Sequence, residues 1–68
     1  MEFTERDQQA IKEYLGYIRA GSKRIYEIDD SRYRDEIAKL MQEDVDAGRS
    51  TGHERRALRE YNERYRKD

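Results

Sequence analysis

The fold is decided by residues 31–45, which read SRYRDEIAKLMQEDV. At about 100° per residue, the apolar side chains of this stretch share one face of a helix while its charged side chains point elsewhere. The apolar members are Tyr33, Ile37, Leu40, Met41 and, at the edge, Val45. Asp29, Asp30 and Ser31 are alternative N-caps. The pattern predicts a helix over residues 31–46 whose apolar face needs a partner.

Two weaker helices are expected to supply that partner. Thr4 and Asp7 have the spacing of a capping box, and Gly21 can end the following helix in a left-handed conformation. These signals predict a helix over about residues 4–20. Its apolar stripe consists of Ile11, Leu15 and Ile18.

Thr51 and Glu54 repeat the capping-box spacing and predict a third helix over about residues 52–66. Leu58 is its one aliphatic core residue, so this helix is expected to pack through tyrosine rings and to be the most mobile of the three. The segment 21–30 is expected to be irregular or to form a short helical turn, because a lone strand has no partner in this chain.

The fold class is therefore all-α, a small three-helix domain over residues 1–68, with residues 1–3 and 67–68 expected to fray. A chain of 68 residues buries only about 60% of its unfolded surface, so the core is small. We expect Ile25, Ile28 and the third helix to leave apolar surface uncovered, which favours a homodimer or a higher assembly.

Composition excludes several classes of protein. The chain has no cysteine, so disulfides and thiolate metal sites are excluded and a cytoplasmic setting is expected. It has no apolar run of about 18 residues and no signal segment, so no membrane association is expected. The net charge is −1 although 46% of the residues are charged, which argues against nucleic-acid binding by bulk electrostatics.

No constellation of residues indicates catalysis. His53 is the only histidine, and the sequence shows no nucleophile beside a base and no metal-ligand spacing. We expect no enzyme activity, no metal, no cofactor and no small-molecule substrate.

Residues 37–59 resemble parts of a helix-turn-helix, with a short helix, a turn and a basic helix in succession. The match is partial, because Gln42 to Ala47 intervene where that motif has a shorter turn, and they include three carboxylates that would repel phosphate. A small DNA-binding transcriptional regulator is therefore the alternative function. An antitoxin-like partner protein, whose last helix folds on binding, is a second alternative.

Arginine and tyrosine are enriched at the hot spots of protein interfaces. The candidate partner-binding residues are Tyr17, Arg24, Tyr26, Asp44, Arg55, Arg56 and Arg59. Asp44 has more than one interpretation, since it lies within the apolar stripe of its helix. In the structural interpretation, the helix frays after Gln42, or Asp44 accepts a hydrogen bond from His53 or from an arginine or a tyrosine of the third helix. In the functional interpretation, Asp44 is an acidic contact for a basic partner.

The sequence as a whole favours a small non-enzymatic interaction module that binds and modulates, by inhibition, a larger cytoplasmic protein. In size and character, such a chain is comparable to the accessory regulators of phages and mobile elements.

Overall fold

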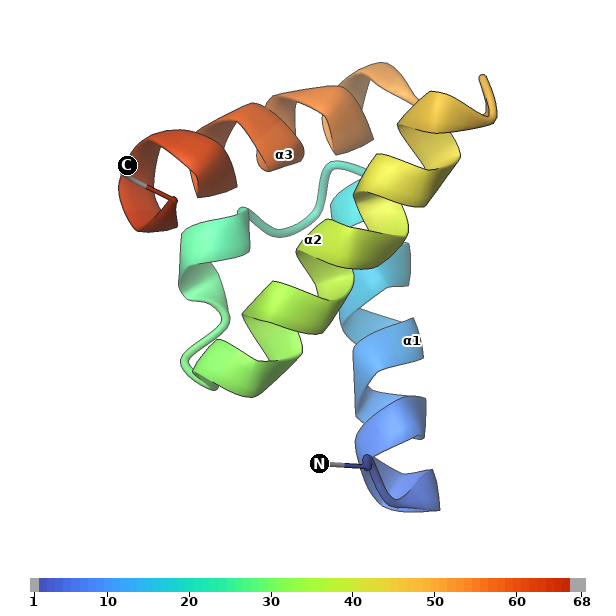
Figure 1. The fold of residues 1–68 in the computed structure, drawn as a ribbon, viewed down its shortest axis with the longest axis vertical. Coiled ribbons are helices and arrows are strands. Elements are labelled where there is room, and N and C mark those ends of the chain that lie inside the picture. The colour runs from blue at the N-terminus through green and yellow to red at the C-terminus, as the bar shows by residue number, and fades with distance from the viewer. Residues whose placement is uncertain (1, 67–68) are drawn as a thin grey trace.

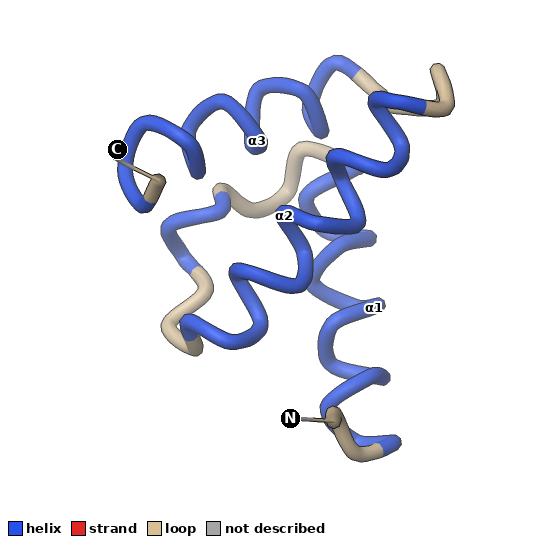
Figure 2. Tube along the Cα trace, viewed as in Figure 1, coloured by secondary structure: helices blue, strands red, loops and turns tan. Residues whose placement is uncertain are grey.

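The computed structural model describes residues 2–66, and in this part of the chain it contains three α-helices and one 3-10 turn. In chain order these are α1 (Glu5–Arg19), the 3-10 turn η1 (Ile25–Glu27), α2 (Ser31–Asp46) and α3 (Gly52–Tyr65). Figure 2 shows them joined by short loops, with no strand among the described residues. The predicted three-helix class is confirmed. Of the residues expected to fray, 1, 67 and 68 lie outside the described residues, and the fraying of residues 2 and 3 stays a prediction.

The helix starts follow the predicted caps. Thr4 Oγ1 accepts a 3.1 Å hydrogen bond from the Asp7 amide, and Asp7 Oδ2 accepts one of 3.1 Å from the Thr4 amide. Thr51 and Glu54 form the same reciprocal pair at α3. Of the three candidate caps of α2, Asp30 is the one used, and it accepts a hydrogen bond from the Arg32 amide. Each helix therefore begins where its side chains satisfy free backbone donors.

The helices cross around one central core. In Figure 1, α2 runs diagonally in front of α1, and α3 lies across the top of the molecule. The chain between α1 and η1 passes behind α2 and brings η1 beneath the C-terminal half of α3. The buried side chains come from all four elements and from the residue after η1: Ile11, Leu15, Ile18, Ile25, Ile28, Ile37, Ala38, Met41, Ala57, Leu58 and Tyr61.

The segment before α2 closes the core instead of leaving it open. Ile25 and Ile28 are fully buried, and Arg34 Nη1 donates a 2.7 Å hydrogen bond to the carbonyl oxygen of Ile28. The predicted short helical turn is thus confirmed. The apolar surface that Ile25 and Ile28 were expected to offer to a second copy is covered within the chain.

The buried face of α2 differs from the predicted one. Ala38 and Asp44 lie on it beside Ile37 and Met41, whereas Leu40 is only half-buried. The reason is that α2 contacts α1 on one side and α3 on the other, so its centre of contact is rotated away from Leu40.

α2 ends at Asp46, as predicted, so the alternative in which it frays after Gln42 is wrong. Gly21 has the predicted left-handed conformation, with φ of 78°.

Candidate functional site

Asp44 lies at the centre of a charge cluster, the Asp44 cluster, in which the buried carboxylates of Asp44 and Glu54 contact the exposed arginines Arg19 and Arg49. Asp44 is 6% exposed, and its carboxylate forms ion pairs with Arg19 of α1 and, at 3.1 Å, with Arg49 of the loop after α2. The Arg49 amide also donates a 2.8 Å hydrogen bond to the Asp44 carbonyl oxygen. The interaction with Glu54, followed by that with Arg19, lowers the pKa of Asp44 to about 2.

Glu54 is the most deeply buried charged residue of this cluster, with 1% of its surface exposed. Its Oε1 accepts the Thr51 amide hydrogen bond and lies 3.6 Å from Nε of Arg19. Its Oε2 is buried without a hydrogen-bond donor. Burial, reinforced by the neighbouring Asp44 carboxylate, raises the pKa of Glu54.

These contacts match the interpretation of Asp44 in which its carboxylate has intramolecular partners. The partners are Arg19 and Arg49, where we expected His53 or a side chain of the third helix. The carboxylates of Asp44 and Glu54 are both buried. The Asp44 cluster therefore joins α1, α2 and α3 and presents little carboxylate surface.

A second group of residues lies on the surface and is here called the Tyr26 patch: Arg24, Tyr26, Glu60 and Arg64. Tyr26 is 40% exposed. The guanidinium carbon of Arg64 lies 4.5 Å from the centre of its ring, and that of Arg24 lies 5.5 Å from it. Both distances are within the range of cation–π attraction.

The Tyr26 patch is held in place by contacts between η1 and α3. Arg24 forms a two-pronged ion pair with Glu60, in which the Nε to Oε1 distance is 3.2 Å. This ion pair lowers the pKa of Glu60. The Glu27 carboxylate accepts a 2.7 Å hydrogen bond from the Arg24 amide, which fixes the start of η1. The exposed ring therefore stands on an ordered base.

The remaining candidates are not brought together in one place. Tyr17 is 44% exposed and carries the Lys23 ammonium group 5.9 Å from its ring centre. Arg56 is half-buried, with its Nη2 3.4 Å from Nδ1 of His53. Arg55 and Arg59 are exposed and line a depression that Arg56 does not line.

Two shallow depressions lie where α2 packs against α3, and together they are here called the α2–α3 groove. Arg55 and Arg59 line the first of them. This first depression has a volume of 390 Å³, with Val45 and Leu58 among its apolar lining residues. The second depression, of 350 Å³, lies between Ala38 and Tyr61. The hydroxyl group of Tyr61 donates a 2.6 Å hydrogen bond to Asp35 across the groove.

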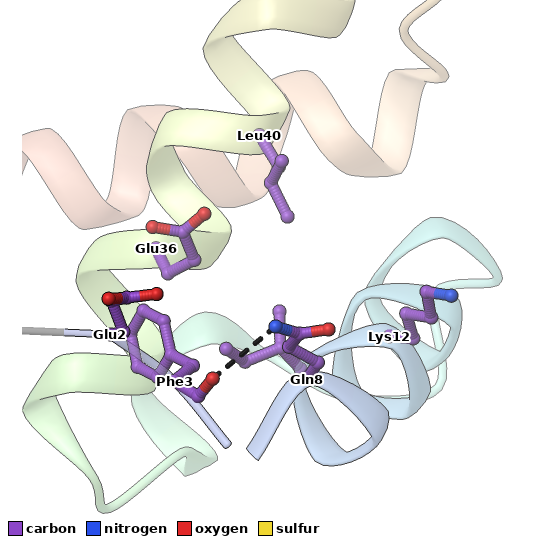
Figure 3. Close-up of a pocket in the computed structure, with 7 residues that line it drawn as sticks. Glu2, Phe3, Gln8, Lys12, Glu36 and Leu40 are labelled. Carbon is purple, nitrogen blue, oxygen red and sulfur yellow. Dashed lines mark hydrogen bonds between the residues drawn. The ribbon is translucent and has the colours of Figure 1, made fainter. Parts of the chain in front are cut away.

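A further depression of 370 Å³ lies beside the start of α1, and Figure 3 shows six of its lining residues labelled. Phe3 and Leu40 are apolar, while Glu2, Lys12 and Glu36 carry charge. The side-chain amide of Gln8 donates a 3.3 Å hydrogen bond to the Phe3 carbonyl oxygen, drawn as a dashed line in Figure 3. Phe3 also packs against Tyr33, with ring centres 6.3 Å apart, so it fixes the chain that precedes α1.

Sequence analysis did not identify Arg19 and Arg49 as members of the Asp44 cluster, or Glu60 and Arg64 as members of the Tyr26 patch. The one signal that could have found the last two is their spacing, since residues four positions apart share one face of a helix. Arg19 carries no local signal, because its contact with Asp44 spans 25 positions.

Comparison with protein-family models, with curated proteins and with solved structures found no match for this chain. Within residues 2–66 there is no group of three or more histidine, cysteine, aspartate or glutamate side chains that could hold a metal ion. None of the helices described here has the length and apolar character needed to cross a membrane.

Proposed function

We propose that this chain is a non-enzymatic interaction module that binds a larger protein through the Tyr26 patch and inhibits that protein by occupying its surface. The observation that carries this proposal is the exposed Tyr26 ring, on an ordered base, with two guanidinium groups within 5.5 Å of its centre. Tyrosine and arginine supply much of the binding energy at protein interfaces. A ring that is already ordered loses little conformational entropy on binding.

The patch also indicates the chemistry of the partner. Arg24 is neutralised by Glu60, whereas Arg64 stacks on Tyr26 and adds a positive charge at the edge of the ring. A partner surface with an apolar pocket for the ring and a carboxylate beside it would complement this arrangement.

The test is an affinity capture from lysate with and without nuclease, repeated with variants. Tyr26→Ala and Arg64→Ala are expected to lose the captured protein, each by about tenfold or more in affinity. Nuclease is expected to have no effect. Arg6→Ala is the matched control, because Arg6 is an exposed arginine near the start of α1.

A capture that requires nucleic acid, or one that survives both Tyr26→Ala and Arg64→Ala, would refute the proposal. Loss of binding with Tyr17→Ala as well would extend the interface to α1, since Tyr17 lies on that helix.

A further inference from the structure

We propose that the α2–α3 groove is the interface of a symmetric homodimer in which α3 of each copy lies over α2 of the other. The two sides of this groove carry opposite charge. The α3 side contributes Arg55, Arg59, Arg66 and Glu63, a net charge of +2. The α2 side contributes Asp35, Glu43 and Lys39, with Asp46 one turn beyond Gln42, a net charge of −2.

A twofold axis that runs along the groove is the arrangement that matches these charges. Rotation by 180° about this axis places the α3 side of one copy over the α2 side of the other, so basic residues face acidic residues at both positions. An in-plane axis perpendicular to the groove would instead place α3 over α3. The charge pattern therefore selects one geometry of self-association.

The geometry also suits the helices. α2 and α3 are joined by the short loop 47–51 and run in opposite directions along the groove, as the Tyr61 to Asp35 hydrogen bond indicates. Under the proposed rotation, each α3 is antiparallel to the α2 that it covers. Four antiparallel helices result, and the apolar side chains in the groove lie in their centre.

The apolar floor of the groove is small, because Ala38, Leu58 and Tyr61 are already mostly buried and Val45 is half-buried. The dimer therefore belongs to the weak class of interfaces, in which charge decides the geometry. Arg55 and Arg59 on one side, and Glu43 and Asp46 on the other, are exposed. Within the chain Arg55 donates a hydrogen bond to the Ser50 carbonyl oxygen, and Asp46 accepts one from Gln42.

The experiment uses two charge-reversed chains and their mixture. One chain carries Arg55→Glu with Arg59→Glu, and the other carries Glu43→Lys with Asp46→Lys. Sedimentation from about 10 µM to about 1 mM covers the range of weak affinities. The wild-type chain is expected to dimerise in this range, and each reversed chain alone to remain monomeric, because like charges then face each other twice. An equimolar mixture is expected to regain the dimer, because both of its contacts are complementary.

A matched control separates this geometry from general attraction between oppositely charged chains. Arg6→Glu with Lys12→Glu, and Glu2→Lys with Glu13→Lys, change the net charge equally at exposed positions outside the groove. Each control chain alone is expected to dimerise as the wild type does.

A wild-type chain that stays monomeric, a reversed chain that still dimerises, or a mixture that does not recover would each overturn the proposal. Circular dichroism checks that each chain is helical. If one double variant is not helical, the single variants Arg59→Glu and Glu43→Lys are used in place of the two double variants. Tyr26→Ala is expected to leave this dimer unchanged. A failure of the dimer proposal can therefore be distinguished from a failure of the proposed function of the Tyr26 patch.

Discussion

Glu54 buries a carboxylate oxygen that has no hydrogen-bond donor. We expect Glu54→Gln to stabilise the protein by about 1 kcal/mol at neutral pH, because an unsatisfied buried polar atom is costly. Glutamine retains the oxygen that accepts the Thr51 amide and serves equally in a capping box. Its amide nitrogen can donate to Asp44. Urea unfolding measures the change, and Glu63→Gln, at an exposed position of the same helix, is the control.

The stabilisation by Glu54→Gln is expected to depend on pH. Burial raises the pKa of Glu54, so the folded state retains a proton that the unfolded chain releases. The stability of the wild-type protein then falls as pH rises from the ordinary glutamate value through the raised one. The advantage of glutamine should be complete near about pH 7 and should vanish towards about pH 4. A constant difference over this range would exclude the buried charge as its cause.

The glycines give opposite expectations. Gly16→Ala is expected to raise stability by about 1 kcal/mol, because Gly16 lies inside α1 and the added Cβ meets no neighbour. Gly21→Ala is expected to lower it, because φ is 78° and the Cβ would lie 2.7 Å from Cε1 of His53. Thermal melting of both variants measures these two changes in stability. A melting point raised by Gly21→Ala would contradict the described end of α1.

At the scale of the helix, the rotated face of α2 predicts unequal effects for two similar truncations. Ile37 is fully buried, so Ile37→Ala is expected to cost about 2 to 5 kcal/mol, a large part of the stability of a small domain. Leu40 is half-buried, so Leu40→Ala is expected to cost about 1 kcal/mol and to leave a cooperative melt. Circular dichroism measures both. Equal losses would place Leu40 in the core after all.

The hydrogen bond between α3 and α2 predicts sensitivity to base. Burial, and then the hydrogen bond to Asp35, raise the pKa of Tyr61 to about 12. The folded state thus resists an ionisation that the unfolded chain undergoes near about pH 10, and stability falls as pH rises from there to about 12. Tyr61→Phe is expected to cost about 1 kcal/mol at neutral pH and to reduce this alkaline decline.

Part of the alkaline decline should remain in Tyr61→Phe, because the hydrogen bond to Asp7 also raises the pKa of Tyr33. Tyr65→Phe is the control at an exposed position. An unchanged alkaline decline in Tyr61→Phe would show that the decline does not arise from Tyr61.

The helices could be predicted from the sequence because their signals are local. A capping box spans three positions, and an apolar stripe repeats within one helix, so Thr4, Thr51 and the stripe of α1 gave the helix bounds. The surfaces depend instead on how the helices cross. Arg24 and Glu60 are 36 positions apart, and no short pattern indicates that they meet.

At the scale of the whole molecule, the division of the basic residues of α3 limits contact with DNA. Arg55 and Arg59 are exposed, whereas Arg56 is half-buried and lies near Glu60. Two phosphate contacts would give a log–log salt slope of about −1.8, or a loss of roughly 12-fold between about 50 mM and about 200 mM salt. We expect no micromolar binding in a fluorescence titration with random duplex DNA.

Tight binding with that slope, abolished by Arg55→Ala and Arg59→Ala, would contradict the protein-partner proposal and favour the DNA-binding alternative. Arg6→Ala is again the control, since Arg6 is exposed near the start of α1.

The position of Glu54 has a consequence for how the molecule opens. The same carboxylate that completes the cap of α3 also touches Arg19 at the end of α1. Separating α3 from α1 therefore breaks this contact at the start of α3 as well as the packing of Leu58 and Tyr61 in the core. Backbone amides in the middle of α3 should then exchange their hydrogen with solvent only when the whole domain unfolds, at the same rate as amides near Ile37. The helix with the fewest aliphatic side chains would thus open together with the rest of the fold.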